Sequence, residues 1–137
     1  PVIAKALAQK GVITSLALDD ACLRWAFGTL IGNTDMHSGN QACLTDRAQP
    51  FSLAPVYDMT PMGFAPTAPG ELPEFRLSLD IIDVVNPSTW ARALSLAQDY
   101  VMRLRTSSLL SRDFAPCVDK LQTHIDHAAE RLKRLAP

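Results

Sequence analysis

The chain has 137 residues, of which 47% are hydrophobic and 20% charged, and its formal net charge at pH 7 is −1. This is the composition of an ordinary globular protein, and the length suits a single domain over residues 1–137 with a buried core. A net charge so close to zero excludes the strong positive field that draws proteins to nucleic acid or to acidic membranes.

Neither the cysteines nor the apolar segments indicate a secreted or membrane protein. The three cysteines, Cys22, Cys43 and Cys117, are odd in number and far apart, which argues against a disulfide framework or a cysteine zinc site and suits a reducing cytoplasm. No apolar run approaches the roughly 18–20 residues that a membrane span requires. Because Pro1 already lies in a helical pattern, we expect a C-terminal fragment of a longer protein.

Two helices are predicted in the first quarter of the chain. The first covers residues 2–10 and ends at Gly11, since glycine often follows the last turn of a helix. The second covers residues 20–31, and either Asp19 or Asp20 is a suitable N-cap for it.

The second helix is apolar on nearly all sides, which is typical of a helix in the middle of a domain. Gly28 inside it lowers helix stability by about 1 kcal/mol relative to alanine, so a close-packed neighbour is expected there. Gly32 is predicted to end this helix directly before the most polar stretch of the chain.

The middle of the chain is predicted to be short of regular structure. Residues 41–45 and 51–53 are short extended runs that predict a small hairpin. Prolines over residues 59–74 exclude a helix or a central strand, and residues 75–81 alternate in the manner of a strand.

Two amphipathic helices are predicted to close the chain, which gives a mainly α fold with a small β-hairpin. One begins after Ser88 as N-cap and the other at about Asp113, and both repeat apolar side chains at 4-3 spacing. The last repeat permits a coiled coil, but its flanking charges follow no consistent pattern, so docking within the domain is favoured. His124 and His127 suggest a metal pair, yet no third ligand accompanies them.

The polar stretch from Gly32 to Asn40 places Asp35 and Asn40 at the spacing of a phosphoryl-transfer loop. In such loops the aspartate accepts or orients the proton of the attacking hydroxyl, and the asparagine helps to hold Mg²⁺. A polar loop that only caps helix ends would have the same composition. Asp58, which the hairpin can return to the same place, favours the catalytic interpretation, because one carboxylate and one amide oxygen suffice for Mg²⁺ on nucleotide phosphates.

The segments Asn33-Thr34-Asp35-Met36-His37-Ser38-Gly39-Asn40 and Leu53-Ala54-Pro55-Val56-Tyr57-Asp58 resemble the HipA-type toxin kinases. That family carries an N-x-D-x-H-x-x-N loop and a hairpin that ends in L-x-P-x-Y-D. The resemblance covers about residues 20–62. It implies the C-terminal helical lobe of a protein-kinase-like fold that phosphorylates serine or threonine with ATP and Mg²⁺ in the cytoplasm.

The resemblance also implies a role for each site residue. Asp35 corresponds to the catalytic aspartate, and His37 belongs to the same catalytic loop. We expect His37 to order the loop or to contact a ligand of the metal, rather than to act as a base. Asn40 and Asp58 correspond to the metal ligands through which the nucleotide is bound. The implied partners are ATP, an N-terminal lobe of the same protein, an unidentified protein substrate, an antitoxin and, only through the antitoxin, DNA.

Two departures from the family pattern keep other functions open. Many relatives have a lysine where this chain has Gly39, and the chain contains no glycine-rich phosphate loop, so the fragment alone is expected to be inactive. One alternative is therefore a catalytically degenerate scaffold in a DNA-associated transcriptional regulator. A weaker one is a metal-dependent phosphohydrolase or nuclease that uses Asp35, His37 and Asp58.

Overall fold

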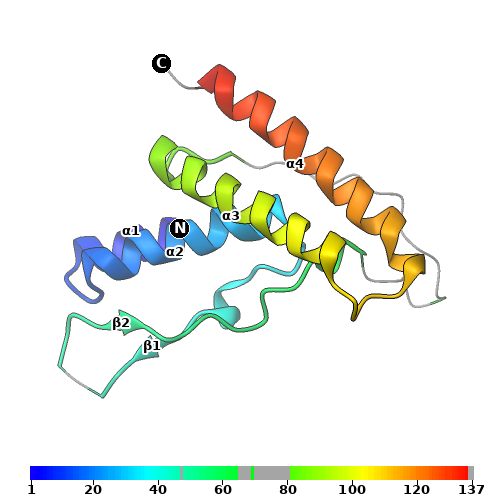
Figure 1. Ribbon diagram of the computed structural model, residues 1–137. Helices are drawn as coiled ribbons and strands as arrows, with labels where there is room; N and C mark the ends of the chain where they lie inside the picture. The colour runs from blue at the N-terminus through cyan, green and yellow to red at the C-terminus, as the bar shows by residue number, and fades with distance from the viewer. Residues whose placement is uncertain (47, 65–68, 70–80, 136–137) are drawn as a thin grey trace.

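A computed structural model of the protein describes residues 1–46, 48–64, 69 and 81–135. Its helices are α1 (Val2–Gln9), α2 (Ser15–Leu30), α3 (Pro87–Thr106) and α4 (Ala115–Leu135), and its strands are β1 (Cys43–Leu44) and β2 (Ser52–Leu53) (Figure 1). Single 3₁₀ turns cover Ser38–Asn40, Met62–Phe64 and Arg112–Phe114. The expectation of a mainly α fold with a small β-hairpin is confirmed. The strand predicted over residues 75–81 lies, up to residue 80, outside the described residues.

Helix α2 is the central element, as its apolar sequence predicted. It contacts α1, α3, α4 and β2, while α3 also packs along α4 (Figure 1). Alanines at the contact surfaces of these helices, among them Ala26, Ala93, Ala97 and Ala128, are fully or almost fully buried, which lets the helix backbones approach closely. The burial of one complete helix face against two others supplies most of the driving force for this arrangement.

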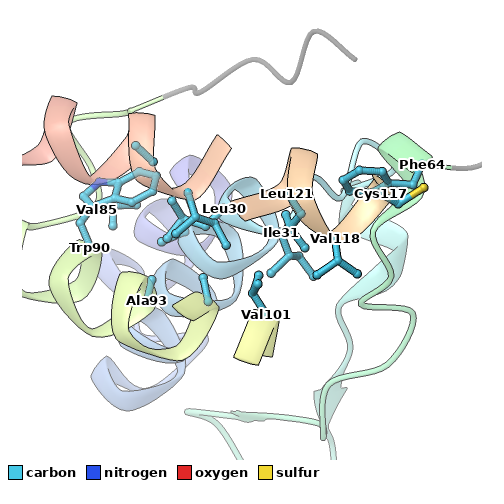
Figure 2. Close-up of a cluster of buried hydrophobic side chains, with 14 of the residues drawn as sticks. Leu30, Ile31, Phe64, Val85, Trp90, Ala93, Val101, Cys117, Val118 and Leu121 are labelled. Atoms are coloured by element: carbon cyan, nitrogen blue, oxygen red, sulfur yellow. The ribbon is translucent and has the colours of Figure 1, made fainter. Parts of the chain in front are cut away.

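Larger side chains fill the core between the helices. Leu30 and Ile31 at the end of α2 meet Val101 of α3 and Leu121 of α4, and all four are almost completely buried (Figure 2). The apolar face of α4 is therefore covered inside this domain, as its sequence favoured. The last turn of α2, from which the polar stretch departs, is thus anchored in the larger cluster of buried side chains.

The start of α2 differs from the prediction. The helix begins at Ser15, and its N-cap is Thr14, whose hydroxyl accepts a hydrogen bond of 3.0 Å from the N–H of Ala17. The N–H of Thr14 donates to the carbonyl of Phe51, so a contact with the hairpin holds the cap residue in its extended conformation. Asp20, one of the two predicted caps, instead forms an ion pair with Arg24.

The start of α3 differs by two residues for a similar reason. The side chain of Asn86, rather than Ser88, accepts the N–H of Thr89 at 2.8 Å and caps the helix. Pro87 is then the first helical residue, where its missing N–H costs little. The hydroxyl of Ser88 donates to Asn86 Oδ1 and so supports the cap.

A second cluster of buried side chains and a glycine turn complete the N-terminal part of the fold. A second, smaller cluster of buried side chains joins α1 and α2 through Ala4, Ile13, Ala17 and Ala21. Gly11 follows α1 with a φ of +69°, a conformation that glycine adopts at little cost, which confirms the predicted helix end. Among the described helices, none is long and apolar enough to cross a membrane.

Candidate functional site

The end of α2 determines where the polar stretch starts. Gly32 has a φ of +73°, which turns the chain away from the helix. Asn33 returns its N–H to the carbonyl of Gly28 at 2.8 Å, and the carbonyl of Gly32 accepts the N–H of Gly63 at 2.8 Å. The loop thus leaves a rigid helix end that is tied on one side to the segment after Asp58.

Close packing at Gly28 adds to this anchoring. A Cβ at this position would collide with Sδ of Met36 and would lie 3.2 Å from Sδ of Met59. Met36 belongs to the polar stretch and Met59 follows Asp58. The prediction that Gly28 makes room for a neighbour is confirmed, and the neighbours are the two segments that carry the candidate site.

Hydrogen bonds from its own side chains shape the polar loop. The N–H of Asp35 donates to Asn33 Oδ1 at 3.0 Å, and Asn40 Nδ2 donates to the carbonyl of Asp35 at 3.2 Å. His37 accepts the N–H of Gly39 through Nδ1 at 3.0 Å and so caps the turn Ser38–Asn40. The His37 ring therefore orders the loop backbone, and any part that it plays in chemistry remains a prediction.

The hairpin brings Asp58 back to this loop. Cys43 pairs with Leu53 across the two short strands, and Arg24 of α2 donates to the carbonyl of Ala54 at 2.7 Å. The Tyr57 hydroxyl then donates to the carbonyl of Gly39 at 2.7 Å. Segments that lie 18 residues apart in the chain are thus joined directly beside Asn40 and Asp58.

Asp58 has an unusual backbone conformation. Its φ is +55°, and among the described residues it is the one non-glycine residue with a positive φ. This left-handed region is unfavourable for a residue with a side chain, and such strain is concentrated at functional sites. The surrounding contacts must therefore hold Asp58 in place.

Three of the four predicted site residues line one cavity of about 450 Å³. His37, Asn40, Tyr57 and Asp58 contribute to its lining, whereas Asp35 does not. The carboxylate of Asp35 lies on the exposed side of the loop. The rest of the lining is largely apolar. It comes from α1, α2, the hairpin, the polar stretch and the residue after Asp58, and it includes Val2, Leu7, Trp25, Met36 and Met59.

The side chains present fit a Mg²⁺ ion that is held mainly by a nucleotide. Within the described residues there is no group of three or more His, Cys, Asp or Glu side chains that could bind a metal by itself. Asn40 uses its amide nitrogen for the bond to Asp35, which leaves Oδ1 unused by that bond, and Asp58, the residue with a carboxylate, lines the same cavity. Oxygen ligands are those that Mg²⁺ prefers, and phosphates supply the rest in nucleotide sites.

One of the two histidines on α4, His124, has a structural role. The ring of His124 is half-buried, and its Nε2 lies 3.1 Å from the carbonyl of Thr29 near the end of α2. Burial is the main cause that lowers the pKa of His124 below its ordinary value of 6.5. The hydrogen bond to Thr29 opposes this shift of the pKa, and the nearby His127 adds to it. Of the two rings, only that of His127 is exposed. His124 instead connects α4 to the helix that carries the loop.

Two side chains at the site were not assigned a role from the sequence. Asn33 and Tyr57 belong to the motifs that carry the family resemblance, yet composition and spacing gave no reason to separate them from an ordinary turn. Both form their contacts with the opposite half of the site. Only the folded arrangement of loop and hairpin reveals those partners.

Comparison with known proteins supports the family resemblance of the sequence. The family model of the HipA-like C-terminal domain matches residues 2–133. A toxin of Escherichia coli strain K12, YjjJ, is 30% identical over 135 residues, which is 98% of this chain and 30% of the toxin. The chain thus spans less than a third of the length of this relative. No solved structure matches.

Proposed function

The chain belongs to the HipA-like C-terminal domain family, and from that premise we propose that it is the C-terminal lobe of an ATP- and Mg²⁺-dependent serine/threonine kinase of the HipA type. The lobe has a protein-kinase-like fold and supplies the catalytic loop and the metal ligands. The observation that carries the proposal is the convergence of Asn40 and Asp58 on one cavity, beside a loop that also holds Asp35.

Each residue has a defined task in this reaction. Asp35, with its exposed carboxylate, accepts or orients the proton of the substrate hydroxyl. Asn40 and Asp58 would hold Mg²⁺ through an amide oxygen and a carboxylate, and the bound ion would neutralise charge on the phosphates. His37 holds the turn between Asp35 and Asn40, so that both residues keep their positions when nucleotide binds.

The proposed lobe forms only one side of a nucleotide site. The glycine-rich loop and the lysine that cradle phosphates in kinases are expected from an N-terminal lobe of the same protein, so the isolated chain should transfer little or no phosphate. The likeness to a toxin supports a toxin–antitoxin context, in which an antitoxin binds this protein and DNA is contacted only through the antitoxin. The protein substrate is a serine or threonine side chain of an unidentified target.

Gly39 favours a second candidate function, a catalytically degenerate scaffold. A Cβ at position 39 would lie 2.8 Å from Cε1 and Nδ1 of His37, so a lysine there would require the ring to move. A cation beside the transferred phosphoryl group stabilises the transition state, and its absence weakens catalysis. In this second function the lobe retains its fold and serves as a binding surface in a transcriptional regulator.

Nucleotide binding by the full natural chain separates the candidates. We expect ATP to bind only with Mg²⁺, and Asp58→Ala to weaken this binding by about 10- to 100-fold, because one of two protein ligands is lost. The matched control is Asp113→Ala, which removes an exposed carboxylate outside the cavity lining and should bind as the unmodified protein does. Asp35→Asn should still bind MgATP but should transfer no phosphate to serine or threonine.

Other outcomes would contradict the kinase proposal. Metal binding without any preference for ATP would indicate a phosphohydrolase or nuclease instead. If the protein binds neither metal nor nucleotide, the result would favour the catalytically degenerate scaffold. Calorimetric titration of the full chain with Mg²⁺, ATP and MgATP distinguishes all three.

A further inference from the structure

Asn33 is one of two polar residues that are buried among the described residues, with 6% of its surface exposed. The other, Thr29, satisfies its hydroxyl locally on the Trp25 carbonyl one helical turn back. Asn33 instead directs its side chain to two different segments. A buried amide is costly unless it is hydrogen-bonded, so these contacts decide how the surrounding backbone is arranged.

The hydrogen-bond partners define the orientation of the Asn33 amide. The backbone N–H of Asp35 can only donate, so the atom 3.0 Å from it must be Oδ1. This leaves Nδ2 on the opposite side, where it lies 3.5 Å from the carbonyl oxygen of Asp58 and 3.5 Å from Sδ of Met59. One planar group therefore contacts the catalytic loop with its acceptor and the Asp58 turn with its donor.

Asp58 needs such a support because of its backbone conformation. A residue with a φ of +55° persists only where neighbouring contacts hold it there. Tyr57 provides one contact at the exposed side of the loop through Gly39, and Asn33 provides the other from the buried side. The buried contact begins at a residue whose own backbone N–H is bonded to the carbonyl of Gly28 in α2 at 2.8 Å.

We propose that Asn33 is a positioning residue that holds the Asp35 loop and the Asp58 turn at a fixed separation, and so places the Asp58 carboxylate for Mg²⁺ on the nucleotide. This inference rests on the proposed kinase function. Asn33 does not touch the metal or the substrate and acts through Asp58 and Asp35. Residues that orient metal ligands in this way typically change metal affinity by about 10- to 100-fold when they are replaced.

Two substitutions at this position separate its two contacts. Asn33→Ala removes both, whereas Asn33→Asp keeps the oxygen that accepts from Asp35 and removes the donor toward Asp58. The matched control is Thr29→Val, which deletes the other buried polar group from the same helix end and leaves the loop contacts intact. All variants are made in the full natural chain.

The first measurement is the Mg²⁺ concentration required for half-maximal binding of ATP at a fixed nucleotide concentration. We expect both Asn33 variants to need about 10- to 100-fold more Mg²⁺, and Thr29→Val to need the same amount as the unmodified protein. If the Mg²⁺ dependence is unchanged in both Asn33 variants, the inference about Asn33 is wrong, but the proposed function still stands. Failure of the unmodified protein to bind MgATP would instead overturn the proposed function.

Hydrogen exchange supplies a second measurement that does not depend on nucleotide. The Asp35 amide should exchange faster in Asn33→Ala but not in Asn33→Asp or Thr29→Val, because only the alanine variant loses the acceptor for this N–H. If the Asp35 amide exchanges equally in all four proteins, Asn33 does not hold the loop and the inference is wrong. Asn33→Asp preserves the Mg²⁺ test should the alanine variant fail to fold.

Discussion

At the scale of single residues, the site depends on side chains that fit closely around the end of α2. Gly28 lets Met36 and Met59 lie against the helix, and Asn33 contacts the backbone of Asp35 and Asp58. The loop and the turn therefore share one small region of the α2 surface. The addition of one methyl group there should disturb the packing of both the loop and the turn.

Gly28→Ala is expected to lower the free energy of unfolding by about 1–2 kcal/mol. Overpacking typically costs about 1–3 kcal/mol, and alanine recovers up to about 1 kcal/mol of helix propensity. The loss should largely disappear when Met36 is also changed to alanine, because the collision is with Sδ of Met36. Urea unfolding of the single and double variants measures this coupling.

Gly11→Ala is the control for this double-variant experiment. Gly11 also tolerates alanine poorly, but the reason is its φ of +69°, since no atom lies within 4 Å of the added Cβ. Its cost, about 1–2 kcal/mol, should be the same with and without Met36→Ala. Equal coupling at both glycines would show that the contact with Met36 is not what restricts position 28.

At the scale of secondary-structure elements, each helix start depends on which of several suitable residues nearby acts as the N-cap. Thr14 and Asn86 cap α2 and α3, although Asp19, Asp20 and Ser88 have suitable side chains as well. Features outside the regular part of each helix decide which residue acts as its N-cap. The contact of Thr14 with Phe51 fixes one start, and the proline after Asn86 fixes the other.

Asn86→Ala should lower the free energy of unfolding by about 1 kcal/mol, because the N–H of Thr89 loses its acceptor. Ser88→Ala should change it by no more than about 0.5 kcal/mol, since this exposed hydroxyl only supports the cap. Chemical denaturation of both variants against the unmodified protein tests the assignment. A larger loss at Ser88 than at Asn86 would restore the cap predicted from the sequence.

At the scale of the whole molecule, residues far apart in the chain hold the site in place. His124 of α4 contacts the carbonyl of Thr29, 95 residues earlier, at the end of the helix that delivers the loop. Burial makes the charged form of this ring unfavourable and lowers its pKa below 6.5. The docking of α4 on α2 should therefore depend on pH.

The sign of this dependence follows from the direction of the pKa shift. The unfolded chain binds a proton at His124 more readily than the folded protein, so the contribution to stability is complete above pH 6.5 and is lost as the pH falls below that value. His124→Gln, which keeps a donor for Thr29, should lose less stability between pH 7.5 and about pH 5 than the unmodified protein. Urea midpoints across this range measure the difference.

His127→Gln is the matched control. His127 is exposed and contributes the smaller electrostatic part of the shift at His124, so its removal should leave most of the pH dependence in place. If the glutamine variants at 124 and 127 behave alike, burial of His124 is not the cause.

The sequence by itself determined the helices, the hairpin, the central position of α2 and the spacing of Asp35, Asn40 and Asp58. These features follow from local periodicity, glycine and turn chemistry, and a family motif, all of which act over short distances along the chain. The family match confirms the predicted membership, while the roles of the site residues remain to be tested.

Only the tertiary structure decided which caps are used, that Asp35 is exposed and does not line the cavity, and that Asn33 and Tyr57 join the two halves of the site. Each of these depends on a partner that is distant in sequence, such as Phe51 for Thr14, Asp58 for Asn33 and Gly39 for Tyr57. Composition and spacing list the groups able to form a hydrogen bond, but packing of the helices and the hairpin selects which donor meets which acceptor.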